Sequence, residues 1–534
     1  MVTLEEPHRP RESRIPLELS TYFDVRTPTA LLREPDGTPY DAPMGTPQGV
    51  EFRVGRNPSP DGRWTEAPWA AAAGVLPAAA ALVSRMRAID LAYHVRAGEL
   101  ALRSGDVVRT DPFTFTVGGE SWLNQQWGAQ VMFASAHRAW GWNAVALTYA
   151  AAIGAGFSFL YRSCRRAGVD PRSAAILTIL GFVVGAGSLG ARPQALAVPL
   201  FTATWLLLAR RDRWTWLVPV LAVVWANVHG SFVLAPALAA FALGDDLLAR
   251  RPAGRGVGVF AATIVATFLT PFGPSVWSYA LDVATDDTIR RTVVEWQPPS
   301  PLSGAGALFW LSGVAVASLA LSRRSAVRAI DVVRLLFFFA LGAAALRSTV
   351  WWGLAAPPIL AAWLAGPQPS AAQPSAEDGS ASADAHRVQA LTAATSVVVL
   401  VAAFLVRSGT DPETGASRRL GADAPEVLVD ATRRAVPAGS RLLVFQPFAS
   451  WFEYSLPGDP VIVDSRIELF TDEVWRDYDT AIVAVDRWRD VVEGWRVGAI
   501  VLPPGAVLAD ELHGDPDWRA LVETDAGSVF ARRS

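Results

Sequence analysis

Polar and ionisable side chains gather in residues 90–127, a segment that follows directly on the first apolar stretch of the chain. It contains the sequences DLAYHVRAG, RTDPFTFT and WLNQQW. Asp90 and His94 are four positions apart, so on a continuous helix their side chains share a face. A carboxylate and an imidazole on one face can act as a general base with an orienting partner, or can bind one metal ion. A helix cap beside a solvated histidine is the simpler alternative.

Two further residues of this segment are candidates for substrate binding. Asp111 precedes a proline, which favours an extended backbone and a turn, so capping of that turn competes with a role in a site. Gln126 lies in residues 122–140, where aromatic and polar residues interleave. This pattern predicts a helix lying in the membrane interface, where tryptophan is favoured. The amides of Gln125 and Gln126 could still bind a hydroxylated ligand.

The composition of the chain predicts an α-helical, polytopic membrane protein. Of its 534 residues, 51% are hydrophobic and only 18% are charged, and the mean hydropathy is +0.26. Soluble proteins carry about 25% charged residues, and a membrane span needs about 20 apolar residues. About eleven segments are candidate spans, two of them short (214–228 and 256–271): 67–84, 142–161, 173–190, 192–209, 214–228, 230–248, 256–271, 305–321, 329–346, 350–365 and 388–406.

The distribution of arginine predicts how these spans are oriented. Four short loops that fall on one side are rich in arginine: Arg162, Arg165 and Arg166; Arg210, Arg211 and Arg213; Arg250, Arg251 and Arg255; Arg323, Arg324 and Arg328. Positively charged loops face the cytoplasm, so this side and the N-terminus are expected to be cytoplasmic. The first loop, residues 85–141, is then extracytoplasmic.

Four residues from distant parts of the chain share that predicted outer face with Asp90. Arg192 and Arg347 could bind phosphate through the planar fork of guanidinium donors, with snorkelling to the interface as the alternative. His229 stands in NVHGSF, where capping a tight turn competes with substrate contact. Glu295 stands out from a charged outer loop because a tryptophan and a proline run follow it.

Three regions flank or interrupt the membrane domain, which is expected to span residues 65–406. Residues 1–64 are polar and rich in proline and arginine, and predict a mostly disordered cytoplasmic tail. Residues 366–386 have the low complexity of a linker. Residues 407–534 differ in composition and predict a small α/β domain, which an odd number of spans places outside the cytoplasm.

Within that C-terminal domain, short apolar runs alternate with amphipathic ones. Residues 441–445, 460–464 and 499–503 predict buried strands, and residues 472–484 and 487–496 predict helices.

The basic and sulfur-containing residues exclude several classes of chemistry. Every Lys/Arg position is arginine, which excludes a lysine Schiff base, pyridoxal phosphate attachment and the lysine-dependent P-loop. Cys164 is the single cysteine, so there is no disulfide framework and no cysteine-based metal site. The net charge of -3 argues against a nucleic-acid partner. Low cysteine content and the arginine bias suit a bacterial plasma membrane.

As a set, these sequences resemble the GT-C superfamily of membrane glycosyltransferases, which includes protein O-mannosyltransferases and the lipid A aminoarabinose transferase. They look most like a group of bacterial GT-C-like proteins. The resemblance covers roughly residues 85 to 530 and is carried by DLAYHVRAGELALRSG, DPFTFT, WLNQQW, GARPQ, NVHGSF, TPFG, VVEWQPP, RSTVWWGLAAPP and VDSRIELF.

The resemblance implies an inverting transfer of a sugar from a polyprenyl-phosphate carrier to an extracytoplasmic acceptor. It also implies a catalytic acidic residue in the first outer loop, and Asp90 matches that position. Leu91 stands where members often carry a second acidic residue, and Gln125 and Gln126 stand where His and Glu are expected. No cofactor is therefore certain, and a divalent cation stays open. The expected partners are a lipid-linked sugar donor, membrane lipids, and a glycan, lipid or protein acceptor.

On this interpretation Asp90 is the general base, and the substrate-binding residues are His94, Asp111, Gln126, Arg192, His229, Glu295 and Arg347. A transporter or lipid flippase is the main alternative, and a non-catalytic assembly protein is the third. Transporters place ionisable groups near the middle of the bilayer. The span interiors carry almost none here, since Asp245, Asp246, Asp331 and Arg334 lie near cytoplasmic ends. This favours an enzyme that works at one face.

Overall fold

The computed structural model describes residues 66–365, 379–412 and 415–533. The predicted tail, residues 1–64, and most of the predicted linker lie outside these described residues. Helix α14 begins at Gly379, so the end of the segment predicted as a linker, residues 379–386, is helical instead.

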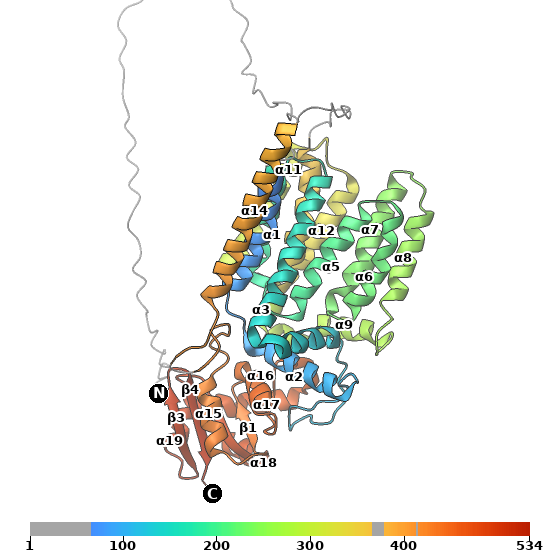
Figure 1. Cartoon of the computed structure of the whole chain (residues 1–534). Helices are drawn as coiled ribbons and strands as arrows, with labels where there is room; N and C mark the ends of the chain where they lie inside the picture. The colour runs from blue at the N-terminus through green and yellow to red at the C-terminus, as the bar shows by residue number, and fades with distance from the viewer. Residues whose placement is uncertain (1–65, 366–378, 413–414, 534) are drawn as a thin grey trace, which may run out of the picture. The chain divides into compact units, whose positions relative to one another are not determined.

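The N-terminal part of the described chain is a set of apolar helices that run side by side (Figure 1). Each of the eleven predicted apolar segments overlaps one of them. Their bounds are α1 Glu66–Val83, α3 Trp127–Arg166, α4 Pro171–Gly185, α5 Pro193–Leu208, α6 Leu217–Ala226, α7 Leu234–Leu248, α8 Gly254–Ala266, α11 Gly304–Ser322, α12 Ala329–Ala344, α13 Thr349–Leu364 and α14 Gly379–Val406.

Six helical segments in the described residues are long and apolar enough to cross a membrane: Glu66–Val83, Trp127–Arg166, Pro171–Ser188, Gly230–Leu248, Gly304–Ser322 and His386–Val406. Shorter apolar helices cover Pro193–Leu208, Arg213–Ala226 and Gly254–Ala266. The chain is therefore a mostly helical, multi-pass membrane protein, and the number of eleven spans stays a prediction.

The predicted interfacial helix begins later than expected. Residues 122–126 are not helical, because the backbone of Trp122 pairs with Arg109 through a hydrogen bond of 2.7 Å to the Arg109 carbonyl. Helix α3 starts at Trp127 and is broken at Trp140 and Gly141, which have non-helical backbone angles. Gly141 has φ 54° and ψ −150°, a conformation that only glycine adopts readily. The first turns of α3 are thus separated by a kink from its membrane-length part.

Short elements connect the apolar helices at the end where the predicted site lies. The helix α2, Ala88–Ser104, follows α1. The other connecting elements are η2 Ala186–Ser188, η4 Gly230–Val233, α9 Ser275–Thr285, α10 Asp287–Thr292, η5 Val294–Trp296 and η6 Leu346–Ser348.

The C-terminal part is a small α/β unit with a four-stranded sheet. The strands are β1 Arg441–Val444, β2 Val497–Leu502, β3 Trp518–Thr524 and β4 Gly527–Arg532, in the order β1-β2-β4-β3. Strands β1 and β2 are parallel, whereas β4 is antiparallel to both of its neighbours. The helices are α15 Glu426–Ala435, α16 Gln446–Ser455, α17 Asp472–Ile482, α18 Trp488–Gly494 and α19 Val507–His513. Two predicted strands and both predicted helices are confirmed, while β3 and β4 were not predicted.

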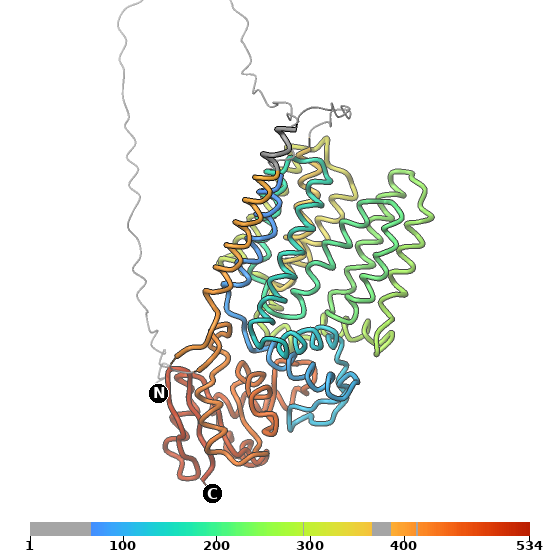
Figure 2. The backbone as a smooth tube through the Cα atoms, viewed as in Figure 1, coloured from blue at the N-terminus to red at the C-terminus, as the bar shows by residue number. Residues whose placement is uncertain are grey.

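The third predicted strand, residues 460–464, is wrong as a strand and forms only isolated bridges. Val461 pairs with Thr114 on one side and with Leu442 of β1 on the other. Pro460 has no amide hydrogen to donate, and Asp464 turns away to bond Arg466, so the pairing cannot extend. The bridge nevertheless joins the first loop to the sheet of the C-terminal unit. Figure 2 shows this blue loop next to the orange and red chain.

Candidate functional site

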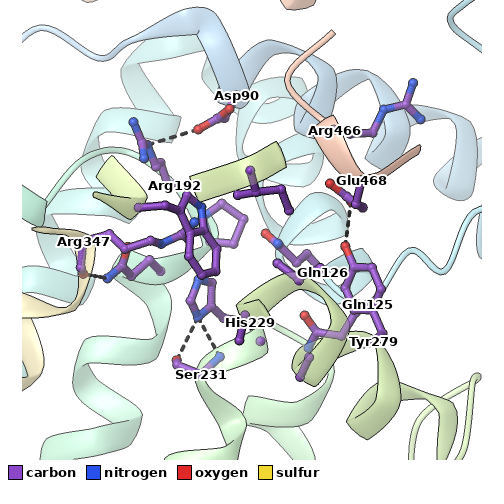
Figure 3. A pocket seen from close by; sticks show the side chains of 18 of the residues that line it. Asp90, Gln125, Gln126, Arg192, His229, Ser231, Tyr279, Arg347, Arg466 and Glu468 are labelled. Atoms are coloured by element: carbon purple, nitrogen blue, oxygen red, sulfur yellow. Dashed lines mark hydrogen bonds and ion pairs between the residues drawn. The ribbon is translucent and has the colours of Figure 1, made fainter. Parts of the chain in front are cut away.

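A cavity of about 430 Å³ lies where the connecting turns meet the C-terminal unit. It collects side chains from α2, the turn before α5, η4, α9, η5, η6 and the segment after Val463. Seven of the eight predicted site residues line it: Asp90, His94, Gln126, Arg192, His229, Glu295 and Arg347. Figure 3 shows several of them around the opening.

Hydrogen bonds between turns bring distant residues of this wall together. Ser188 donates its hydroxyl to the carbonyl of Leu346 at 2.6 Å, and Gln194 donates its amide to the carbonyl of Arg347 at 2.8 Å. The backbone amide of Leu346 donates to the carbonyl of Gln297 at 2.9 Å. The turns that carry Arg192, Glu295 and Arg347 are therefore tied to one another.

Arg192 is the centre of a cluster of three charges. Its Nη2 donates to Glu295 Oε1 at 2.6 Å, its Nη1 donates to the other carboxylate oxygen, and its Nε lies 3.2 Å from Asp90 Oδ2 (Figure 3). Burial opposes ionisation of Glu295, but the hydrogen bonds from Arg192 and the charges of Arg192 and Arg347 hold the pKa of Glu295 below its usual value. The N–H groups of Arg192 that face Asp90 and Glu295 are already in use, so Arg192 can offer a ligand fewer than its five donors.

Arg347 differs from Arg192 because its guanidinium bonds to no carboxylate among the described residues. It lies over the ring of Trp296, 4.5 Å from the ring centroid, and lines the cavity. Burial and the nearby charge of Arg192 lower the pKa of Arg347, yet arginine stays protonated in proteins. A half-buried, ionised group with free donors is suited to binding an anion.

The position of Asp90 is set by the helix α2 and by what holds that helix. The backbone amide of Ile89 donates to Asp423 Oδ2 at 2.8 Å, and the amide of Tyr93 donates to Ser450 Oγ at 2.8 Å. On its other side α2 packs closely on α3, where a Cβ added to Gly98 would clash with the carbonyl of Gln130. Contacts from both parts of the chain thus hold α2 in place.

His94 is buried at 3% exposure and belongs to an amide network. Asn124 and Gln130 exchange two hydrogen bonds of 2.7 Å through their side-chain amides, and Gln130 Nε2 also donates to His94 Nδ1 at 3.3 Å. Burial, followed by the charges of Arg466 and Arg192, lowers the pKa of His94 to about 3. His94 is therefore a neutral imidazole whose Nδ1 accepts, which leaves the proton on Nε2.

His229 both lines the cavity and caps the turn η4. Its Nδ1 accepts a hydrogen bond of 3.1 Å from the backbone amide of Ser231, as Figure 3 shows. Burial and the charge of Arg347 hold the pKa of His229 well below its usual value. His229 thus makes the turn cap that was expected as an alternative to substrate contact, and it also faces the cavity.

The two glutamines that precede α3 lie differently. Gln125 donates to the carbonyl of Ala226 at 2.6 Å, and its Oε1 is buried without a partner. The side chain of Gln126 makes no hydrogen bond within the described chain and lines the cavity. Gln126 can therefore donate and accept toward a hydroxylated ligand.

Asp111 is the predicted site residue that does not line the cavity. It is 3% exposed, and its carboxylate accepts from the backbone amides of Phe113 and Thr114, from the Thr114 hydroxyl and from Arg466 Nη2. These bonds use its lone pairs, so no ligand can reach them. Asp111 acts as a turn cap, as its position before a proline suggested.

Arg466 is a lining residue that sequence reasoning did not single out. Its guanidinium is bonded to Asp464 as well as to Asp111. The guanidinium carbon also lies 4.5, 5.0 and 5.8 Å from the ring centroids of Trp122, Phe113 and Tyr93. The sequence VDSRIELF places this arginine directly after a buried apolar run, which is the signal that could have found it.

Glu468 and Tyr279 form a second polar pair on the cavity wall that was not predicted. Tyr279 donates its hydroxyl to Glu468 Oε1 at 2.7 Å, and Figure 3 draws this pair apart from Arg347 and Arg192. Burial raises the pKa of Glu468, although the hydrogen bond from Tyr279 opposes the shift. The pair forms only when α9 packs against the C-terminal unit, so the sequence near Glu468 does not indicate it.

The described side chains around the cavity do not form a cluster of metal ligands. No group of three or more His, Cys, Asp or Glu side chains that could hold an ion occurs in the part of the chain that is described. Asp90, one of the two suggested ligands, is bonded to Arg192 instead. These residues do not fit a resident cation, and the roles given below use none.

Searches of protein-family models and of curated proteins find no match to this chain. Among solved structures, the Archaeoglobus fulgidus oligosaccharyltransferase in the apo form is similar, with a TM-score of 0.48 and 12% identity, covering 82% of this chain and 69% of that one. The same enzyme tethered to an acceptor peptide containing the NVT sequon has a TM-score of 0.48 and 11% identity, with 83% and 70% covered.

A third structure is archaeal oligosaccharyltransferase AglB from Archaeoglobus fulgidus in complex with an inhibitory peptide and a dolichol-phosphate. Its TM-score is 0.47 and its identity 10%, and the alignment covers 80% of this chain and 69% of that one. Similarity of this degree assigns no activity, so the function of the chain has to follow from its own residues.

Proposed function

We propose that the chain is a membrane glycosyltransferase that moves a sugar from a polyprenyl-phosphate donor to an acceptor. One observation carries the proposal. Arg347 presents an ionised guanidinium with free donors to a cavity, while the neighbouring Arg192 is already bonded to Asp90 and Glu295. An unpaired, half-buried cation of this kind is stabilised when an anionic ligand reaches it.

The donor's two chemical parts match two parts of the cavity wall. Arg347 supplies donors for a phosphate. Apolar side chains line the same cavity and suit a hydrocarbon chain: Val233, Leu234, Ala280, Leu281, Val283 and Leu341. Leu281 on α9 both lines the cavity and is largely exposed, so this side of the cavity has an apolar edge.

Asp90 is proposed as the general base toward the acceptor. A proton passes from the acceptor O–H or N–H to the Asp90 carboxylate as the acceptor atom bonds to the anomeric carbon. The bond from that carbon to the phosphate oxygen breaks, and its electron pair leaves with the phosphate. Attack opposite the leaving group inverts the anomeric centre. Arg347 stabilises the charge that develops on the phosphate, and Arg192 holds the Asp90 carboxylate in place.

The remaining polar groups are proposed to bind the two substrates. His94 and His229 are neutral and can offer Nε2–H donors to sugar hydroxyls, and Gln126 can donate and accept. Glu468 and Tyr279 lie apart from the phosphate-binding arginine and are assigned to the acceptor, which is a glycan, a lipid or a protein. Asp111 acts through Arg466 on the wall of the cavity and contacts neither substrate.

The predicted orientation is part of this proposal. The arginine-rich loops are placed in the cytoplasm, and the cavity and the α/β domain of residues 407–534 face the outside of a bacterial plasma membrane. The dolichol-phosphate and acceptor peptide bound by the archaeal oligosaccharyltransferase are ligands of the two classes expected here.

The test is sugar transfer in proteoliposomes supplied with a radiolabelled polyprenyl-phosphate sugar and a mixture of candidate acceptors. We expect label to move to an acceptor with the unchanged protein, and not with Asp90→Asn, which should still insert into the membrane. Unchanged turnover in Asp90→Asn removes Asp90 from the mechanism. Movement of the lipid across the bilayer without sugar transfer would instead support a flippase.

A further inference from the structure

A second cavity, of about 490 Å³, lies at the other ends of the helices that form the first one. Gln194 at the start of α5 lines the first cavity, whereas Leu208 at the end of α5 lines the second. Helix α7 gives Leu234 to the first and Asp245 to the second in the same way. At 1.5 Å per residue, the two cavities are roughly 20 Å apart along α5.

The rim of the second cavity is basic. It is lined by five arginines and two aspartates: Arg166, Arg210, Arg211, Arg328, Arg334, Asp245 and Asp331. Both aspartates are already bonded. Asp245 accepts from Arg211 and, at 3.0 Å, from Arg328, and Asp331 accepts from Arg328 at 2.7 Å. Arg211 and Arg328 thus neutralise the negative charges of the two aspartates.

The other three arginines keep donors available. Arg334 donates to the carbonyl of Phe241 at 3.0 Å and lies 3.6 Å from Asp331. Arg210 pairs with the exposed Asp212 at 2.8 Å, a contact that solvent screens. Arg166 has no carboxylate within ion-pair distance among the residues that the structure describes. The rim therefore has positive charge that the protein does not neutralise.

Beneath this rim the cavity is apolar. Its floor is made by side chains of three helices, α5, α7 and α13: Trp205, Leu208, Leu238, Phe241, Pro358 and Ile359. A free phosphate would gain nothing from such a floor, whereas burying a hydrocarbon chain there removes apolar surface from water and is favourable. A basic rim above an apolar floor between membrane helices is the arrangement that binds anionic lipid headgroups.

We propose that this second cavity binds an anionic phospholipid, with its phosphate at Arg166, Arg210 and Arg334. The acyl chain lies against the apolar floor. The bound lipid supplies the negative charge that the rim lacks and links the ends of α3, α5 and α12. This proposal does not depend on sugar transfer, because the residues involved are separate from the first cavity.

The experiment measures lipid binding to the purified full-length protein in detergent by native mass spectrometry, with phosphatidylglycerol and phosphatidylcholine as probes. We expect phosphatidylglycerol to bind in preference, and the double variant Arg166→Gln/Arg210→Gln to bind it at least about tenfold more weakly, since each arginine contributes about 1 kcal/mol near an anionic headgroup. The matched control is Arg323→Gln/Arg324→Gln, which removes the same charge from exposed residues of the α11–α12 turn that do not line the cavity.

Three results would overturn the proposal: no preference for phosphatidylglycerol, equal weakening in both double variants, or displacement of the lipid by millimolar inorganic phosphate, which would make the site one for free phosphate. Thermal unfolding of each variant shows whether it is folded. If the double variant fails to fold, the single variant Arg166→Gln is measured, and unchanged phosphatidylglycerol affinity in that folded protein counts against the site.

Discussion

The carboxylate of Asp423 accepts a hydrogen bond of 2.8 Å from the backbone amide of Ile89, 334 positions earlier in the chain. Ile89 lies in the first turn of α2, immediately before Asp90. The first turn of a helix has amides without intrahelical partners, and a negative charge there is favourable. A residue beyond the last apolar helix therefore supplies the cap of the helix that carries the proposed base.

Replacing Asp423 by alanine should remove this cap. We expect a loss of about 1 kcal/mol in the free energy of unfolding, the usual effect of losing an N-terminal cap. Sugar transfer should fall by more than the stability does, because the first turn of α2 orients Asp90. Thermal unfolding in detergent and transfer in proteoliposomes measure the two effects. Asp486→Ala, at an exposed position of the C-terminal unit, is the matched control and should change neither.

Arg347→Gln should weaken binding of the donor phosphate. A hydrogen bond to a charged group contributes about 1.5–3 kcal/mol, which corresponds to roughly 10- to 100-fold in affinity. The affinity is measured as binding of polyprenyl phosphate to the purified protein, with Arg323→Gln as the charge-matched control. Equal affinity of Arg347→Gln and the unchanged protein would remove Arg347 from the donor site.

Arg192 and Glu295 should be strongly coupled in stability. Arg192→Gln leaves the carboxylates of Asp90 and Glu295 close together without the guanidinium that bonds both of them, so it should destabilise the protein more than Glu295→Gln does. The double variant should lose less stability than the two single losses added together. Unfolding midpoints of the four proteins form the cycle that tests this coupling, and strict additivity would contradict it.

The buried imidazole of His94 should make the protein less stable in mild acid. Its pKa is about 3 in the folded state, against about 6.5 when unfolded. Between these values the unfolded chain binds the proton and the folded chain does not, so stability falls as the pH drops below about 6.5. The variant His94→Asn keeps an acceptor near Nδ1 and lacks the titration. From pH 7 to pH 5, the unchanged protein should lose more stability than His94→Asn, and equal slopes would refute the assignment.

Much of the wall of the first cavity was predictable from the sequence because membrane helices impose sidedness. Once the arginine-rich loops are put on one face, Asp90, Arg192, His229 and Arg347 must share the other. The structure collects these residues around one cavity. Their pairing could not be foreseen, since the bond of Arg192 to Glu295 depends on how two connecting turns are tied through Leu346.

The C-terminal contribution was missed for a different reason. Arg466 and Glu468 belong to a short segment without helical or strand periodicity, and their function depends on partners more than a hundred positions away, namely Asp111 and Tyr279. Sequence periodicity reports on local structure and carries no information on such long-range pairs. The same limit applies to residues 460–464, whose apolar run resembles a strand but forms bridges only at Val461.

The bridge of Val461 to Thr114 and Leu442 bears on the order in which the protein is made. Synthesis proceeds from the N-terminus, so the first loop leaves the ribosome well before its partner at Val461 exists. During that interval α2 lacks Asp423, Asp111 lacks Arg466, and the cavity lacks one wall. The site is therefore completed only when the C-terminal unit has been translated and has folded against the loop, and a chain that stops before Val461 cannot form the complete cavity.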